Sequence, residues 1–86
     1  MLKFIQAAKL VAIIRLPDLT HAIDLARALV DGGFRVLEFT LNSPGALQAI
    51  TEVSAALPEI IRGEVAIGAG TVLTAQDAEA AIDAGA

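Results

Sequence analysis

The chain has 86 residues, of which 56% are hydrophobic and 19% are charged, and its formal net charge is −4. This acidic balance, with no basic run and no aromatic stacking cluster, argues against a nucleic-acid partner, and no segment has the uncharged length of a membrane span. The absence of cysteine excludes disulfides and thiolate metal sites and fits a reducing cytoplasm. We therefore expect one small, apolar-rich layered domain, residues 1–86, without an internal boundary.

The first part of the chain predicts one strand followed by one helix. Residues 1–9 are expected to form a short helix that leads into a strand at residues 10–14, a continuous apolar run too short for a helix. Asp18 is the expected N-cap of the following helix, and Gly32-Gly33 predict its end. The apolar residues at helical spacing between them are Ala22, Leu25, Ala26, Leu29 and Val30.

The second part repeats this plan. A strand at residues 36–41 precedes Ser43 as N-cap and Pro44 at the first helical position, and Pro58 is the expected terminator. The predicted buried side of this helix consists of Leu47, Ile50, Val53, Ser54 and Leu57.

The third part repeats it again. A strand at residues 65–68 leads to a helix that starts at a capping-box-like segment, with Thr74 as the capping residue. Its expected buried residues are Ala78, Ala81 and Ile82.

Three consecutive βα units place the chain in the α/β class, with parallel strands joined by right-handed crossovers. Two architectures satisfy this pattern, a doubly wound open sheet and a (β/α)8 TIM barrel. A complete barrel needs about 200 residues or more, so in the barrel architecture the chain is an amino-terminal portion. A dinucleotide-binding interpretation of Gly68-Ala69-Gly70 is disfavoured, because the third small residue of that fingerprint would fall at Leu73.

The second predicted strand carries a carboxylate in an apolar run. Val36, Glu38 and Thr40 share one face of this strand, whereas Leu37 and Phe39 share the face expected beneath the helices. Burying an ionised carboxylate without partners is costly, so Glu38 must be paired, protonated or used in chemistry.

Arg15 and Thr71 are expected near Glu38, because all three come close to carboxyl ends of successive parallel strands, where α/β folds place their chemistry. Other interpretations remain open. Glu38 could form a structural ion pair with Arg15, Arg15 could simply reach solvent, and Thr40 and Thr71 could be ordinary strand residues. No metal site is predicted, since His21 is the only histidine and is expected to be exposed.

Three segments together resemble the 2-keto-3-deoxy-6-phosphogluconate (KDPG) aldolases: residues 11–15 (VAIIR), 32–41 (GGFRVLEFTL) and 68–73 (GAGTVL). The resemblance covers nearly the whole chain. It implies a (β/α)8 class I aldolase that cleaves a 2-keto-3-deoxy-6-phospho sugar acid to pyruvate and glyceraldehyde 3-phosphate, without a metal or organic cofactor. It also implies a homo-oligomer, usually a trimer.

The resemblance implies roles for individual residues. Glu38 matches the general acid/base, Thr71 matches a threonine that holds the pyruvate carboxylate, and Arg15 matches an arginine that faces the substrate. Asn42 stands where gluconate-type members carry a substrate-contacting arginine, and is similar to the galactonate-type relatives. Thr40 is a further possible site residue on the Glu38 face.

The Schiff-base lysine of the resembled family lies on a later strand. Lys3 and Lys9 are poor substitutes, because a nucleophilic lysine needs desolvation and a nearby base. Two hypotheses follow. In the first, the chain is the amino-terminal portion of an aldolase and is inactive alone. In the second, it is a noncatalytic partial barrel that assembles with copies of itself or with a complementary half-barrel through its sheet edge.

Overall fold

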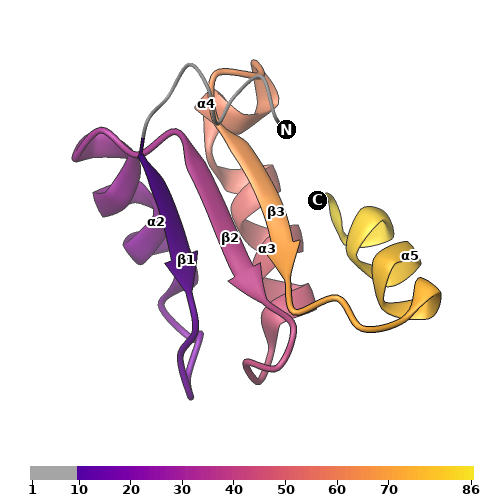
Figure 1. Ribbon diagram of the computed structural model, residues 1–86. Helices are drawn as coiled ribbons and strands as arrows, with labels where there is room; N and C mark the ends of the chain where they lie inside the picture. Colours follow the sequence, from indigo (N-terminus) through magenta and orange to yellow (C-terminus); the bar gives the residue numbers. More distant parts are fainter. Residues whose placement is uncertain (1–9) are drawn as a thin grey trace.

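The computed structural model describes residues 10–86. They form a three-stranded parallel sheet in the order β1-β2-β3, with β1 at Val11–Ile14, β2 at Val36–Thr40 and β3 at Ala66–Gly70 (Figure 1). The helices are α2 (Ala22–Asp31), α3 (Ala46–Ala56), the single turn α4 (Pro58–Ile61) and α5 (Ala75–Ala84). The short helix predicted for residues 1–9 lies outside the described residues.

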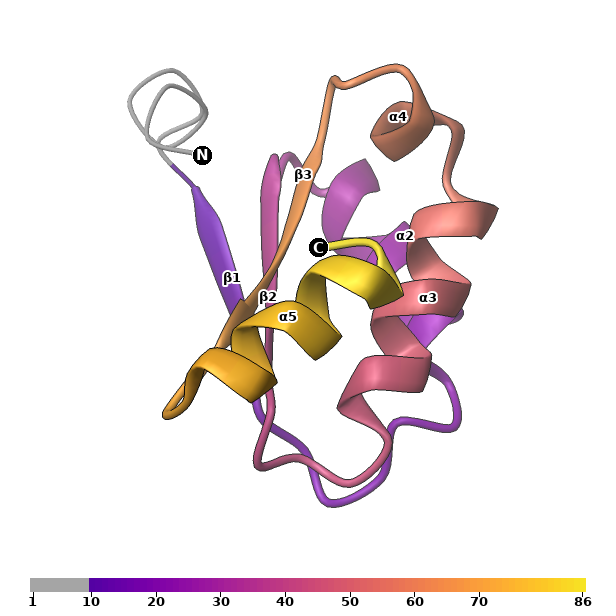
Figure 2. The same ribbon diagram turned by 90° about the vertical axis from the view of Figure 1, so that its right-hand side faces the viewer.

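The helices gather on one side of the sheet. Figure 2 shows α2, α3 and α4 on one face, with α5 beside β3 and against α3, and within residues 10–86 no helix covers the opposite face. A doubly wound sheet has helices on both faces and reverses its strand order, whereas a (β/α)8 barrel keeps consecutive order with helices outside. The fold is therefore three consecutive βα units of the barrel type, as predicted.

The predicted alternation in β2 is confirmed on its helix-facing side. Leu37 and Phe39 are both fully buried at 0% exposure, and they pack in the apolar core between the sheet and the helices. The same alternation runs through β1, where Ile14 is 5% exposed but Ile13, on the open face, is 67% exposed. The sheet thus has one face packed against the helices and an opposite face, called the open face, that no helix of residues 10–86 covers. On the open face Val36 and Thr40 are nevertheless buried, at 1% and 2% exposure.

The end of α2 matches its prediction. Gly32 is the C-cap, and Gly33 has φ +108°, a backbone conformation that glycine adopts without steric cost. The amides of Gly33 and Phe34 donate to the carbonyls of Val30 and Leu29, at 3.1 Å and 3.0 Å. This is a Schellman ending, which turns the chain toward β2.

Two predicted helix starts are wrong. Asp18 does not cap α2, because its Oδ1 accepts from the Thr20 amide at 2.9 Å, and the helix begins later, at Ala22. Short polar side chains commonly satisfy a nearby turn in preference to a helix end. Ser43 does not cap α3, which starts at Ala46 after Gly45, with φ +78°. Pro44 therefore precedes the helix.

The start of α5 is confirmed, since the Thr74 Oγ1 accepts from the Asp77 amide at 3.0 Å. At the end of α3, Leu57 is the C-cap, and Pro58 ends one helix while it opens the short α4. Two predicted core residues are exposed instead, Leu47 at 40% and Ile82 at 68%. Within residues 10–86 no helix is long and apolar enough to cross a bilayer.

An ion-pair network joins α2 to α4. Arg27 Nη1 donates to Glu59 Oε1 at 3.0 Å and Arg27 Nη2 to Asp31 Oδ1 at 2.8 Å, and a second bond links Arg27 Nη2 to Glu59. The hydrogen bonds from the Arg27 guanidinium lower the pKa of Glu59 to about 2. The same residue, Glu59, accepts from the Glu64 and Val65 amides through its main-chain carbonyl, at 2.8 Å and 3.1 Å, in the turn before β3.

Candidate active site

Glu38 occupies the centre of the open face. Its strand, β2, lies between the other two, and in the register Glu38 is level with Ile13 of β1 and Gly68 of β3. A Cβ atom placed on Gly70 would overlap Glu38 Oε1. The carboxylate therefore extends over the carboxyl end of β3, and the missing side chain of Gly70 makes room for it.

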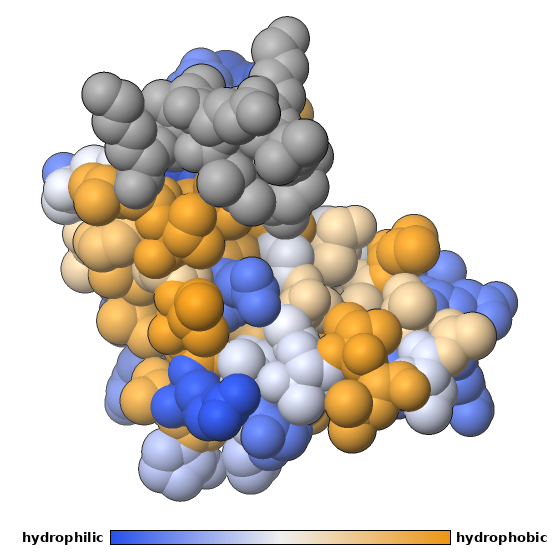
Figure 3. All heavy atoms as spheres, in the orientation of Figure 1, coloured by the Kyte–Doolittle hydropathy of each residue, from blue (hydrophilic) through white to orange (hydrophobic). Residues whose placement is uncertain are grey.

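Arg15 and Thr71 meet beside this carboxylate. Arg15 follows β1 and Thr71 follows β3, yet Arg15 Nη2 donates to Thr71 Oγ1 at 3.4 Å. The distance is at the long end for a hydrogen bond, but it shows that the guanidinium reaches across the end of the middle strand. Hydrophilic groups are accordingly set among apolar areas on this face (Figure 3).

Thr71 has an unusual backbone. Its φ of 57° is the one positive value for a residue other than glycine within residues 10–86. For a β-branched residue this is a sterically costly conformation, of order 1–3 kcal/mol, and such residues cluster at binding and catalytic sites. No sequence pattern predicts this conformation at Thr71. It turns the chain sharply away from β3 while the hydroxyl stays at Arg15.

The alternative interpretation, a structural ion pair between Arg15 and Glu38, is not seen within residues 10–86. The salt bridges formed within the described part of the chain join other residues, and Arg15 contacts Thr71 instead. Glu38 is thus not held as the partner of this arginine.

Thr40 and Asn42 lie differently. Thr40 is 2% exposed, and its hydroxyl contacts the Ile14 carbonyl at 3.3 Å and Ser43 Oγ at 3.0 Å, so it is used inside the protein. Asn42 is exposed on the connection between β2 and α3. Of the five predicted site residues, the structure therefore brings Arg15, Glu38 and Thr71 to one place.

A family model described as KDPG and KHG aldolase matches residues 2–86. The chain belongs to this aldolase family. The KHG/KDPG aldolase of Escherichia coli K12 is 43% identical over 76 residues, which cover 88% of this chain and 33% of that protein. The 2-dehydro-3-deoxy-phosphogluconate aldolase of Dickeya dadantii is 38% identical over 84 residues, 98% of this chain and 37% of that protein.

Solved aldolase structures agree with this assignment. The KDPG aldolase of Zymomonas mobilis ZM4, determined with 3-phosphoglycerate, has a TM-score of 0.81 at 36% identity over 96% of this chain and 37% of its own. The Legionella pneumophila enzyme, with pyruvate captured as a covalent carbinolamine intermediate, has a TM-score of 0.79 at 36% identity, covering 93% of this chain and 36% of its own. This aldolase-family chain spans about a third of the length of these relatives.

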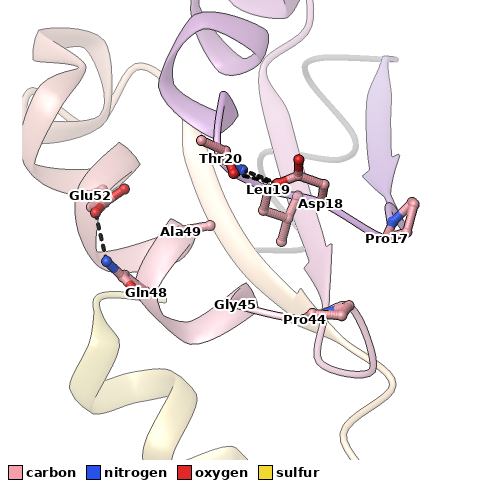
Figure 4. Close-up of a pocket in the computed structure, with 9 residues that line it drawn as sticks. All are labelled: Pro17, Asp18, Leu19, Thr20, Pro44, Gly45, Gln48, Ala49 and Glu52. Atoms are coloured by element: carbon pink, nitrogen blue, oxygen red, sulfur yellow. Dashed lines mark hydrogen bonds between the residues drawn. The ribbon is translucent and has the colours of Figure 1, made fainter.

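The candidate site of this aldolase-family chain lies on the surface of the sheet, at the carboxyl ends of its strands. A separate hollow of about 340 Å³ lies between the connection that follows β1 and helix α3, where Asp18, Thr20, Gln48 and Glu52 contribute polar groups (Figure 4). Neither Glu38 nor Thr71 lines it. Within residues 10–86 no three His, Asp, Glu or Cys side chains gather as metal ligands would.

Sequence reasoning missed two residues that shape the site. The sequence analysis assigns no site role to Gly70. A usable signal is the pair Gly68 and Gly70 at a strand end, next to a strand that carries a carboxylate. Ser43 is predicted as a helix cap, but its hydroxyl accepts from the Leu16 amide at 3.1 Å.

Proposed function

We propose that this chain supplies the proton-transfer group and part of the anion-binding surface of a Schiff-base (class I) aldolase that cleaves 2-keto-3-deoxy-6-phospho sugar acids to pyruvate and glyceraldehyde 3-phosphate. One observation carries the proposal. In a chain of the KDPG and KHG aldolase family, the Glu38 carboxylate lies over Gly70 beside the Arg15–Thr71 contact, at the carboxyl ends of three parallel strands.

Glu38 is the general acid/base in this proposal. Aldol cleavage requires a base that takes the proton of the C4 hydroxyl while the C3–C4 bond breaks and its electron pair moves into the Schiff base of the lysine supplied from outside residues 10–86. It then requires an acid that returns a proton to C3 of the resulting pyruvate enamine. A single carboxylate performs both steps in turn when it stays in reach of the C4 hydroxyl and of C3. Glu38 is suited to this because Gly70 lets its carboxylate lie along the sheet surface.

Arg15 and Thr71 bind the anionic end of the substrate in this proposal. The planar guanidinium presents paired N–H donors that match a carboxylate or a phosphate, and the Thr71 hydroxyl adds a donor beside it. Their contact spans the end of β2, so an anion bound there sits next to the Glu38 side chain. The chemistry calls for no metal or organic cofactor.

The lysine nucleophile is the part that residues 10–86 do not contain. The two lysines of the chain, Lys3 and Lys9, lie outside the described residues. We expect neither to form a Schiff base, so the 86-residue chain alone is inactive. Borohydride treatment with labelled pyruvate tests this, and a stoichiometric adduct on either lysine would overturn it.

A chimera tests the role of Glu38. Residues 1–86 replace the matching segment of the Escherichia coli KHG/KDPG aldolase, which supplies the rest of the barrel. We expect aldol cleavage by the chimera and a fall in kcat of roughly 10²- to 10⁴-fold in its Glu38→Gln variant. Glu52→Gln is the control, because Glu52 is an exposed helix carboxylate that only accepts from Gln48. A folded chimera without activity, or an active Glu38→Gln variant, contradicts the proposal.

A second candidate function is noncatalytic assembly, with copies of the chain or with a complementary half-barrel. The observation that favours it is the exposed apolar surface beyond β3, where Leu73 is 81% and Ile82 is 68% exposed. Sedimentation of the purified chain distinguishes the two. A trimer or other oligomer weakened by Leu73→Asp supports assembly, and a monomer at all concentrations refutes it.

A further inference from the structure

Arg15 is held on both sides by one chain of hydrogen bonds. The Leu16 amide donates to Ser43 Oγ at 3.1 Å, and Thr40 Oγ1 donates to the Ile14 carbonyl at 3.3 Å. Ser43 Oγ and Thr40 Oγ1 are themselves 3.0 Å apart. Because the Thr40 hydroxyl proton is donated to the Ile14 carbonyl, the Ser43 hydroxyl is the donor in its contact with Thr40. Each hydroxyl then donates once and accepts once, and the chain runs from one peptide group beside Arg15 to the other.

This pair of hydroxyls is inside the protein. Thr40 is 2% and Ser43 is 5% exposed, and they are the two polar residues among the buried side chains of the described region. Buried hydrogen-bonded groups of this kind hold geometry firmly, since breaking one bond leaves a polar group without a partner. Ser43 does not serve helix α3, whose N-cap is Gly45.

The hydroxyls act where the sheet stops. The paired register of β1 and β2 ends at Ile14 and Phe39, so Arg15 lies just past the last sheet pair. On the other side of β2, the Leu41 amide donates to the Gly70 carbonyl at 2.9 Å, which holds the residue before Thr71. The end of β2 thus fixes the chain next to Arg15 and the chain next to Thr71 at once.

We infer that Thr40 and Ser43 are positioning residues that aim the Arg15 guanidinium at Thr71 and thereby set the affinity of the site for an anionic substrate group. Neither hydroxyl contacts the substrate, because both are buried and form hydrogen bonds with main-chain groups and with each other. The part of this inference that concerns affinity rests on the function proposed above. The part that concerns the geometry of Arg15 does not.

The geometric part is tested by NMR on the 86-residue chain. In the wild type we expect slow exchange of the Leu16 amide and a cross-peak between the Arg15 side chain and the Thr71 methyl group. Ser43→Ala should speed Leu16 exchange by about threefold to tenfold, and Ser43→Ala and Thr40→Val should each weaken the cross-peak. Thr40→Ser keeps the hydroxyl and should restore it.

Thr51→Val is the matched control. The Thr51 hydroxyl also donates to main-chain carbonyls, those of Leu47 at 3.2 Å and Ala84 at 2.9 Å, but Thr51 lies on α3 away from Arg15. Its loss should lower stability without moving the Arg15 cross-peak. An unprotected Leu16 amide in the wild type overturns the inference, and this measurement does not depend on any variant folding.

The affinity part is tested by titrating the same variants with pyruvate. We expect the dissociation constant to rise about threefold to tenfold in Thr40→Val and Ser43→Ala, and to stay at the wild-type value in Thr40→Ser and Thr51→Val. Wild-type chain that does not bind pyruvate refutes the proposed anion-binding role of Arg15 and Thr71, while the NMR results still decide the geometry. Unchanged affinity in variants that have lost the Arg15 cross-peak refutes the positioning role alone.

Discussion

Replacing Gly70 with alanine should separate activity from stability. A Cβ at this position would overlap Glu38 Oε1, while the other nearby atoms are also those of the Glu38 side chain, with Cδ at 3.1 Å and Cγ at 3.3 Å. Since these atoms belong to a flexible side chain, the carboxylate is expected to move by about 1 Å and the backbone to stay in place. A displacement of about 1 Å at a reacting group costs roughly 10²-fold in rate.

The cost to folding should be small. Gly70 is not among the glycines with positive φ, so alanine fits its backbone, and the loss of unfolded-state freedom stabilises the fold by about 0.4–1 kcal/mol. A shifted Glu38 rotamer costs about 0.5–1.5 kcal/mol. These terms nearly cancel, so we expect the free energy of unfolding to change by less than about 1 kcal/mol.

The assay compares kcat of the chimera with denaturant unfolding of the chain. Gly32→Ala is the control substitution, because an added Cβ there would meet the Ala28 carbonyl at an ordinary 3.4 Å, far from the candidate site. Gly70→Ala with wild-type kcat would refute the placement of Glu38 as the proton-transfer group. Strong destabilisation by Gly70→Ala would refute the claim that the side chain, and not the backbone, yields.

Three further results are expected. The pKa of Glu59 is lowered to about 2 from an unperturbed 4.5, so its ion pair with Arg27 stabilises the fold fully above about pH 5. This stabilisation is lost as the pH falls toward 2. The difference in Tm between wild type and Glu59→Gln should therefore shrink over that pH range. Thr71→Gly should relieve backbone strain of order 1–3 kcal/mol and leave stability equal or higher in urea unfolding, yet abolish pyruvate binding; lower stability would contradict the strain. Phe39→Ala should destabilise the chain by about 3–5 kcal/mol, measured by the same unfolding, because Phe39 is fully buried.

The sequence was sufficient for features that depend on periodicity. Alternation in residues 36–40 correctly separated Leu37 and Phe39 from Glu38, because strand geometry leaves only two faces. Helix starts were less predictable. By residue type, equally good helix caps are Asp18, Ser43 and Thr74, but only Thr74 caps a helix. The side chain of Asp18 accepts from the Thr20 amide, and that of Ser43 accepts from the Leu16 amide after β1.

The candidate site was predictable in composition but not in its contacts. Parity and strand order brought Arg15, Glu38 and Thr71 together, because carboxyl ends of parallel strands share one edge. The strained backbone of Thr71 depends on the turn out of β3, and the hydroxyl pair that fixes Arg15 joins segments 27 residues apart in sequence. Neither the Thr71 backbone conformation nor the hydroxyl pair produces a pattern of neighbouring residues that could be recognised in the sequence.

The open face links the two candidate functions through one residue. Ile13 is level with Glu38 in the sheet and is 67% exposed, so an apolar side chain and the proposed catalytic carboxylate share the same uncovered surface. Proton transfer by a carboxylate is efficient where bulk water is excluded, and burial of Ile13 is favoured by about 1.5–3 kcal/mol for a side chain of this size. Any part of a barrel that covers Ile13 therefore also shields Glu38. Binding of a covering segment to this face would then also exclude water from the Glu38 carboxylate. A substitution such as Ile13→Ser should therefore weaken both the assembly and the proton transfer.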